Sequence, residues 1–268
     1  TKPVVAIFLG EKPENHEGKV YLAHTLEETA RMAVDLANGD PIKDNYCDPI
    51  DYEVSRPLAA DKTVKGLYSG GSLAAEAGML IAEALNLGGL IKEEGYILKT
   101  GGYEVVDLGD DVYTQGKPHP MIDPEVRIKK ILECAKDPQT GVILLDCMLG
   151  YGCHPDMAGA LAPAIREAQE IAKADGRELY FVASVCGTRQ DPQDYDRAVA
   201  ELKECGVLVE ESNARAIRLA LKLKGIDYKE NTRGHVEAAV DETPLPEPDE
   251  KIMELLNTKP RVINVGVR

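Results

Sequence analysis

The segment 109–124 holds the densest group of residues that could do chemistry. It combines His119 with the carboxylates of Asp110, Asp111 and Asp123, together with three prolines and two glycines. Histidine transfers protons near neutral pH, and carboxylates can position a cation or a substrate nitrogen. We predict His119 and Asp111 as catalytic residues. Only one aspartate of the pair Asp110 and Asp111 is expected to serve the site, because adjacent residues on a turn point in different directions. Asp123 is a supporting residue or, as the alternative, the cap of a following helix.

A second candidate is the run Ser69, Gly70, Gly71 and Ser72, which follows an apolar stretch and precedes a helical pattern. Glycines let the backbone turn tightly and approach a ligand, and the amides at a helix start attract anions. These four residues are therefore predicted to bind a phosphate or a carboxylate. The alternative is an ordinary turn in which Ser72 caps the helix.

Two further loops carry residues of the same kind. Gly150 and Gly152 permit close backbone approach to an anion, and His154 follows them as a supporting residue. Arg189 offers a guanidinium fork that suits carboxylate or phosphate. Arg127, one turn after the 109–124 segment, is a further supporting residue and is expected to face either that loop or solvent. The cysteine beside His154 has no further ligands at zinc spacing, so no metal site is predicted.

These loops all follow apolar runs that alternate with helical patterns. Such alternation predicts an α/β fold with a doubly wound, parallel, flavodoxin-like sheet, and the carboxyl edge of that sheet would gather all four loops. Four polar loops at one edge of the sheet are predicted to form a ligand-binding site. The predicted strands span 63–68, 103–108, 141–148, 178–185 and 206–209, and the predicted helices span 72–86, 124–136, 156–174, 192–204 and 213–224.

An internal similarity suggests how the chain is divided. Residues 2–39 follow the order strand, strand and helix, and residues 178–225 repeat it, with Thr25 and Ser212 as helix caps and an arginine six residues after each. We expect a partial copy of the α/β domain at 1–39 and a complete one at 62–226. Chance likeness of amphipathic helices is the alternative. Residues 40–61 are expected to be a linker, and 227–268 an acidic connector and terminal strand.

Composition narrows the classes of function. The net charge of −15, with two Phe and no Trp, argues against a nucleic-acid interface and against binding to anionic membranes. Six cysteines without a CxxC pair suggest reduced thiols in the cytoplasm, and no apolar run approaches membrane length. Strands are predicted close to both ends of the sequence. We therefore expect the chain to continue or to assemble into an oligomer.

Seven stretches spread over nearly the whole chain belong to a recognisable pattern. They are KPVV at 2–5, GLYSGGSLAAEA at 66–77, DLGDD at 107–111, GKPHPMIDP at 116–124, LGYG at 149–152, GTRQDPQ at 187–193 and VINVGVR at 262–268. In these stretches the chain resembles the FdrA family of acyl-CoA synthetase-like proteins. That family is related to the alpha subunit of succinyl-CoA synthetase.

The resemblance implies a ligase-type, flavodoxin-like domain at 62–226. In the synthetases, two helix starts point at the phosphate of a phosphohistidine. Here those positions look like 69–72 and 150–152. The Gly-His-Ala-Gly-Ala segment that holds the synthetase histidine is absent from this sequence. Members of the family are associated with purine and allantoin catabolism, as a subunit of oxamate carbamoyltransferase.

Two classes of function follow from this resemblance. In the first, the chain is an enzyme subunit that handles a small anionic substrate, an acyl or carbamoyl phosphate or an acyl-CoA. Acyl-CoA ligation and carbamoyl transfer remain rivals, and CoA or carbamoyl phosphate would bind through the full assembly. In the second, the chain is a non-catalytic structural subunit. In both, its partners are other protein subunits or the rest of a split FdrA chain.

Overall fold

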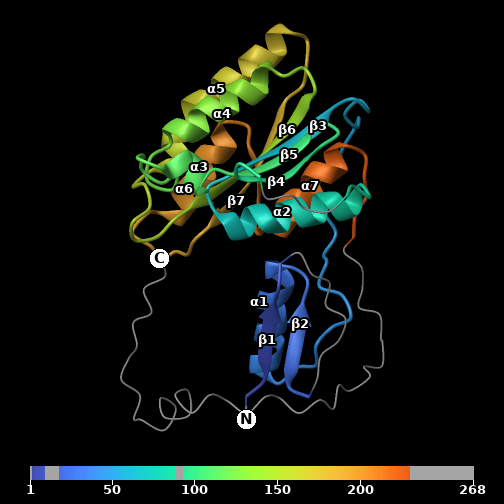
Figure 1. Ribbon diagram of the computed structural model, residues 1–268. Helices are drawn as coiled ribbons and strands as arrows, with labels where there is room; N and C mark the ends of the chain where they lie inside the picture. Colours follow the sequence, from blue (N-terminus) through green and yellow to red (C-terminus); the bar gives the residue numbers. More distant parts are fainter. Residues whose placement is uncertain (1, 10–17, 89–92, 230–268) are drawn as a thin grey trace. The chain divides into compact units, whose positions relative to one another are not determined.

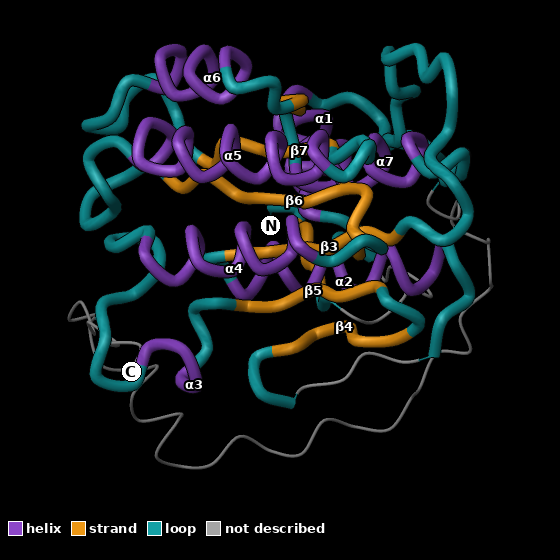
Figure 2. Tube along the Cα trace, turned by 90° about the horizontal axis from the view of Figure 1, so that it is seen from above, coloured by secondary structure: helices purple, strands orange, loops and turns teal. Residues whose placement is uncertain are grey.

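The computed structural model describes residues 2–9, 18–88 and 93–229. Most of the predicted connector and terminal strand, at 230–268, lies outside the described residues. The larger sheet has six strands in the order β4-β5-β3-β6-β7-β8. Figure 2 shows β4, β5, β3, β6 and β7 side by side in that order. The strands are β3 (Thr63–Tyr68), β4 (Tyr96–Thr100), β5 (Tyr103–Asp107), β6 (Thr140–Met148), β7 (Tyr180–Cys186) and β8 (Leu208–Glu210).

Five of these strands are parallel, from β5 to β8, and only β4 is antiparallel to its neighbour. Numbered along the chain without β4, the parallel strands have the order 2-1-3-4-5, which is the flavodoxin-like order. The predicted fold class is therefore confirmed. The predicted ranges of these five strands also agree with the observed ones to within two residues.

Helices cover both faces of the sheet, as Figure 1 shows. Consecutive residues of β6 alternate between two cores: Ile143 packs with α4, α5 and α6, whereas Leu144 packs with α2 and α7. A strand covered on both faces must be apolar on both, which explains the continuous apolar run. The helices are α2 (Gly71–Ala84), α3 (Asp111–Thr114), α4 (Glu125–Lys136), α5 (Met157–Ala174), α6 (Tyr195–Glu204) and α7 (Asn213–Leu223).

Strand β4 and the short helix α3 were not predicted. β4 joins β5 through Gly101 and Gly102, whose φ angles are +56° and +85°. Two such residues form the tight turn of a β-hairpin, because its backbone twist matches that of the flanking strands. The glycine pair between two β-rich runs was the signal for this hairpin.

The amino-terminal residues form a smaller unit of two parallel strands and a helix: β1 (Val4–Ile7), β2 (Val20–Ala23) and α1 (Leu26–Asn38). Thr25 caps α1 by accepting from the backbone N–H of Glu28, and Ser212 caps α7 in the same way. Both predicted caps are confirmed. The interpretation of 1–39 as part of a second α/β domain stays a prediction.

A buried carboxylate connects α1 with α7. Glu27 lies 2.7 Å from the guanidinium groups of both Arg31 and Arg218, and it accepts from the Ser212 hydroxyl at 3.1 Å. The side chains of Glu27 and Arg218 are 6% and 3% exposed.

Between α1 and β3, residues 40–61 contain no helix or strand, but Ile50 packs into the core beside α2 and α7.

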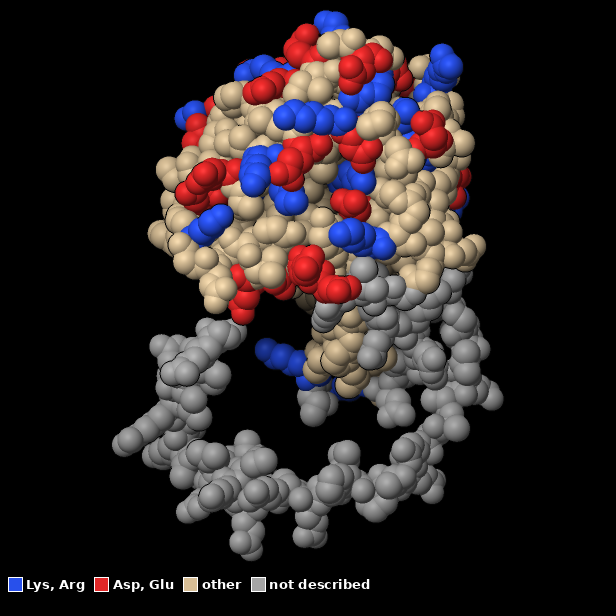
Figure 3. Space-filling view, turned by 45° about the horizontal axis from the view of Figure 1, so that its top comes forward, with Lys and Arg blue, Asp and Glu red and all other residues tan. Residues whose placement is uncertain are grey.

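Charges of both signs are mixed on the surface. On the face seen in Figure 3, Lys and Arg side chains are interspersed with Asp and Glu and form no continuous basic patch. Within the described ranges, none of the helices combines the length and the apolar character that a membrane crossing requires.

Candidate functional site

The carboxyl ends of the parallel strands bring the four predicted loops to one edge of the sheet. The loops follow β3, β5, β6 and β7. β3 has β5 on one side and β6 on the other, so the chain moves in opposite directions across the sheet from this strand. Ligands of open α/β sheets bind at such a switch point. The loops after β3, β5 and β6 are therefore where this fold favours a site.

The turn that follows β3 holds a carboxylate of the protein itself. Asp146, fully buried in β6, accepts hydrogen bonds at 2.9 Å from the backbone N–H groups of Ser69 and Gly70. The Ser69 hydroxyl donates to the same carboxylate at 3.0 Å. The structure thus differs from the prediction for Ser69 and Gly70, because their amides serve an internal anion.

Arg127 completes this buried group. Its side chain is 0% exposed, and Nη2 donates to the Asp146 carboxylate at 3.0 Å and also to the Asp146 carbonyl. Its Nε and Nη1 have no hydrogen-bond partner among the described residues, so Asp146 is the anion that balances the buried charge. The expectation that Arg127 faces the loop or solvent is wrong. Asp146 escaped the sequence analysis, although it is the one charged residue in the apolar run 141–148.

Gly71 and Ser72 form the exposed start of α2. The helix is capped by Gly70 without a side-chain hydrogen bond, so Ser72 lies inside the helix and is not its cap. A Cβ atom added to Gly71 would lie 2.6 Å from Oδ2 of Asp107. A larger residue at this position would have to displace the Asp107 carboxylate from the start of α2.

Asp107 is the last residue of β5 and is half-buried. Burial raises the pKa of this carboxyl above its usual value; the hydrogen bond from the Gly109 N–H at 2.8 Å opposes that rise, and the neighbouring Asp110 adds to it. A carboxyl group at the end of a strand beside a histidine can take part in proton transfer. The sequence analysis missed Asp107, because it fits the alternating pattern of its strand.

The side chains of His119 and Asp107 both lie next to Gly109. A Cβ atom added to Gly109 would lie 2.6 Å from Nε2 of His119, 3.0 Å from the Ser69 carbonyl oxygen and 3.1 Å from Oδ1 of Asp107. Nδ1 of His119 accepts a hydrogen bond from the backbone N–H of Met121 at 3.2 Å. The loop thus fixes one edge of the imidazole and leaves Nε2 beside Asp107.

The other predicted acids lie elsewhere. Asp111 is exposed in the first turn of α3, and within the described residues no hydrogen bond or ion pair joins its carboxylate to His119. Asp110 caps this turn by accepting from the Val112 N–H. Asp123 accepts from the Glu125 N–H at 2.9 Å, but the cap residue of α4 is Pro124, so Asp123 lies one residue before the predicted cap position.

The loop after β6 is held by Gln193. The side chain of Gln193 accepts from the Gly150 N–H at 2.9 Å and donates to the carbonyl oxygens of Gly150 and His154 at 3.0 and 3.2 Å. The Gly150 amide is therefore already occupied, whereas a Cβ added to Gly152 would meet open space. His154 donates its backbone N–H to the Met121 carbonyl at 2.7 Å, which joins this loop to the His119 loop.

Arg189 forms an ion pair of its own. Its Nε and Nη2 donate to both carboxylate oxygens of Asp196 on α6, at 3.0 and 2.9 Å. The hydrogen bond raises the pKa of Arg189 and lowers that of Asp196. Both side chains are largely exposed. The structure does not bring Arg189 into contact with His119 or Asp107, so its predicted role as an anion ligand lacks geometric support.

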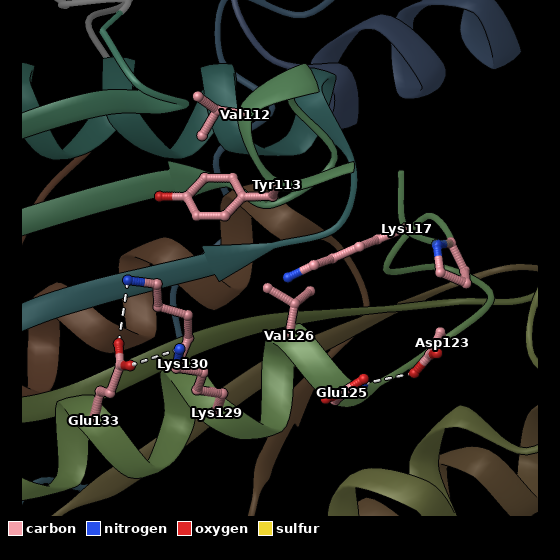
Figure 4. Close-up of a pocket in the computed structure, with 10 residues that line it drawn as sticks. Val112, Tyr113, Lys117, Asp123, Glu125, Val126, Lys129, Lys130 and Glu133 are labelled. Atoms are coloured by element: carbon pink, nitrogen blue, oxygen red, sulfur yellow. Dashed lines mark hydrogen bonds and ion pairs between the residues drawn. The ribbon is translucent and has the colours of Figure 1, made fainter. Parts of the chain in front are cut away.

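A pocket of about 370 Å³ lies between α3 and α4 (Figure 4). Tyr113 and Val126 supply apolar surface, and the amino group of Lys117 reaches toward Val126. Lys130 is engaged with Glu133 at 3.2 Å. The lining carries both signs of charge and does not include His119, so we assign the pocket no ligand.

Metal ligands are not gathered at this edge. In the described ranges no three His, Cys, Asp or Glu side chains are grouped so that they could hold a metal ion. The groups that can donate to an anionic ligand are Nε2 of His119 and the first amides of α2, and the Asp107 carboxyl lies beside them.

Comparisons with known proteins agree with this architecture. Residues 67–223 match the family model described as CoA-ligase. An uncharacterised protein of Escherichia coli strain K12, YahF, is 35% identical over 236 residues, which cover 82% of this chain and 45% of that protein. The chain thus spans less than half the length of this curated relative.

Proposed function

Because the chain belongs to the CoA-ligase family, we propose that it is an acyl-CoA synthetase-like protein of the FdrA type, which binds an acyl or carbamoyl phosphate, or an acyl-CoA, and takes part in group transfer. One observation carries the proposal. Nε2 of His119, the carboxyl of Asp107 and the exposed start of α2 meet beside the switch point of the sheet.

The chemistry of these groups suits an anion with a reactive carbonyl. The first N–H groups of a helix have no partner within the helix and attract negative charge, so those of Gly71 and Ser72 can hold a phosphate. Nε2 of His119 can donate to an oxygen on which charge develops. The Asp107 carboxyl, which lies beside His119, can exchange a proton with the reacting group.

Carbamoyl transfer is one form of this reaction. A phosphate oxygen would attack the carbamoyl carbon of oxalurate, and the bond from that carbon to the oxamate nitrogen would break. The nitrogen would take a proton, for which Asp107 is placed, and carbamoyl phosphate and oxamate would leave.

Acyl-CoA ligation is the rival form. The CoA sulfur, having lost its proton, would attack the carbonyl carbon of an acyl phosphate, and phosphate would leave with the electrons of the broken C–O bond. We propose that the rest of the assembly, as other subunits or further FdrA segments, supplies the remaining binding groups.

Isothermal calorimetry of the native assembly tests these alternatives. We expect saturable heat with carbamoyl phosphate or with CoA, and the ligand that binds decides between the two reactions. His119→Ala should reduce transfer on the order of 10²-fold or more, as loss of one charge-stabilising donor does. The absence of heat with both ligands would contradict the proposal.

The second candidate is a non-catalytic subunit whose partners carry the chemistry. It is favoured by the absence of a Gly-His-Ala-Gly-Ala segment and by the engagement of Arg189 with Asp196. An assembly that contains His119→Ala and keeps full activity would support this role. It would remove His119 from the chemistry.

A further inference from the structure

Two histidines of this chain are held by the same local device. The only two His-Pro pairs in the sequence are His119-Pro120 and His154-Pro155. In each, Nδ1 of the imidazole accepts a hydrogen bond from the backbone N–H of the residue after the proline, at 3.2 Å for His119 and 3.0 Å for His154. The His119 turn lies on the loop between β5 and α4, and the His154 turn lies on the loop between β6 and α5.

A backbone hydrogen bond joins the two turns. Met121, whose N–H holds the His119 ring, accepts at its carbonyl from the N–H of His154 at 2.7 Å. The loop of His154 is in turn held by the side chain of Gln193. The two imidazoles are therefore positioned by one connected set of backbone contacts.

This device fixes the tautomer of each ring. A neutral imidazole has one nitrogen that donates and one that accepts, and here the backbone N–H makes Nδ1 the acceptor. Nε2 consequently carries the proton. Among the described residues Nε2 of His119 has no hydrogen-bond partner. The Ser69 carbonyl oxygen and Oδ1 of Asp107 lie near it, since all three atoms are within 3.1 Å of the position that a Cβ atom of Gly109 would take.

We propose that His119 binds an oxyanion of the substrate by donating its Nε2–H and does not accept a phosphoryl group, with His154 as a second donor from the adjoining loop. The inference rests on the proposed function for the identity of the substrate, but the tautomer follows from the hydrogen bonds alone. A nucleophilic Nε2 needs a free lone pair, and hence a proton on Nδ1, where the Met121 N–H now points. The oxyanion is a phosphate or an acyl oxygen.

Nitrogen NMR of the chain labelled with [¹⁵N]histidine tests the tautomers directly. Long-range ¹H–¹⁵N couplings distinguish the two ring nitrogens, and substitution of each histidine in turn assigns the signals. We expect Nε2–H for His119 and for His154 in their neutral forms. His24, whose Nε2 is engaged with Glu83 at 3.0 Å, is the internal reference. A proton on Nδ1 of His119 would overturn the inference.

Titration with inorganic phosphate tests the ligand. We expect the Nε2 signals of His119 and His154 to shift while those of His24 stay in place. Shifts in neither ring, with the tautomers as expected, would overturn the assignment as oxyanion donors. After incubation with acetyl phosphate, ³¹P spectra should show no phosphoramidate signal. A phosphoramidate signal that is present in the parent and absent from His119→Gln would also overturn the inference.

Paired substitutions separate donation from other roles. The amide nitrogen of Gln reaches the position of Nε2, whereas that of Asn reaches the position of Nδ1. His119→Gln should bind phosphate within about threefold of the parent, and His119→Asn should bind it on the order of tenfold more weakly, as expected for a hydrogen bond to a charged group. Equal losses in folded Gln and Asn variants would contradict donation through Nε2.

The proposed function can fail while this inference stands. If phosphate shifts both rings but the assembly transfers neither acyl nor carbamoyl groups, the oxyanion site is retained and the transfer reaction is rejected.

Discussion

Removing the Asp146 carboxylate should destabilise the protein strongly, because this group satisfies several buried partners at once. Asp146→Ala leaves the fully buried Arg127 without its anion and removes the acceptor of the Ser69 and Gly70 amides. Breaking a buried ion pair by deleting one partner costs about 3–5 kcal/mol, and unpaired amides add about 1 kcal/mol or more. We expect a total loss of about 4–6 kcal/mol, a large part of the roughly 5–15 kcal/mol that stabilises a domain.

Urea denaturation and calorimetry measure this loss. At about 2–4 °C per kcal/mol for a domain of this size, the melting temperature should fall by about 10–20 °C. Asp196→Ala is the matched control, because it deletes the partner of an arginine in an exposed ion pair, with side chains 76% and 64% exposed. We expect no measurable change in that control.

The double variant Arg127→Met/Asp146→Leu separates the charge from the amides. Replacing a buried pair by apolar residues is often neutral, so it should recover most of the stability that Asp146→Ala loses. The remaining deficit measures the loss of the acceptor for the two amides and the Ser69 hydroxyl. If Asp146→Ala fails to fold, Asp146→Asn keeps the side-chain shape and one acceptor oxygen, and it removes the charge together with the second acceptor. A loss below about 1 kcal/mol in Asp146→Ala, or a double variant as unstable as the single one, would refute the reasoning.

Three further perturbations test the site and the contact of α1. Gly109→Ala should weaken phosphate binding on the order of tenfold in calorimetry, because its Cβ would lie 2.6 Å from Nε2 of His119. Gly88→Ala is the control: its Cβ would have no atom within 4 Å, so this variant should bind phosphate like the parent. Asp107 has a folded pKa above 3.8, so its stabilising contribution is present below the unfolded pKa and lost as pH rises through the folded pKa. The stability of Asp107→Asn relative to the parent should therefore increase between pH 4 and pH 7 in urea titrations, and a constant difference would contradict a raised pKa. Glu27→Gln removes the charge that pairs with the buried Arg218 and should speed proteolysis within 40–61 several-fold, with equal cleavage rates as the contrary result.

Local signals identified the elements reliably. The apolar run 141–148 and the alternation of strands with helical patterns depend on residues close in sequence, and they led to the observed parallel sheet. Thr25 and Ser212 were recognised as caps for the same reason, since each accepts from an amide three residues ahead. The antiparallel β4 was missed, because its apolar residues lie between a helix and a stronger strand signal.

Long-range contacts decided which groups form the site. The sequence by itself determined the flavodoxin-like fold and placed the polar loops at one edge, since both follow from periodicity and chain order. Only the tertiary structure showed that Asp146, 77 residues from Ser69, fills the turn expected for a ligand, and that Asp107 rather than Asp111 lies beside His119. Spacing along a strand does not reveal which side chain faces a neighbouring loop, because that depends on the register between strands and on where each loop folds back.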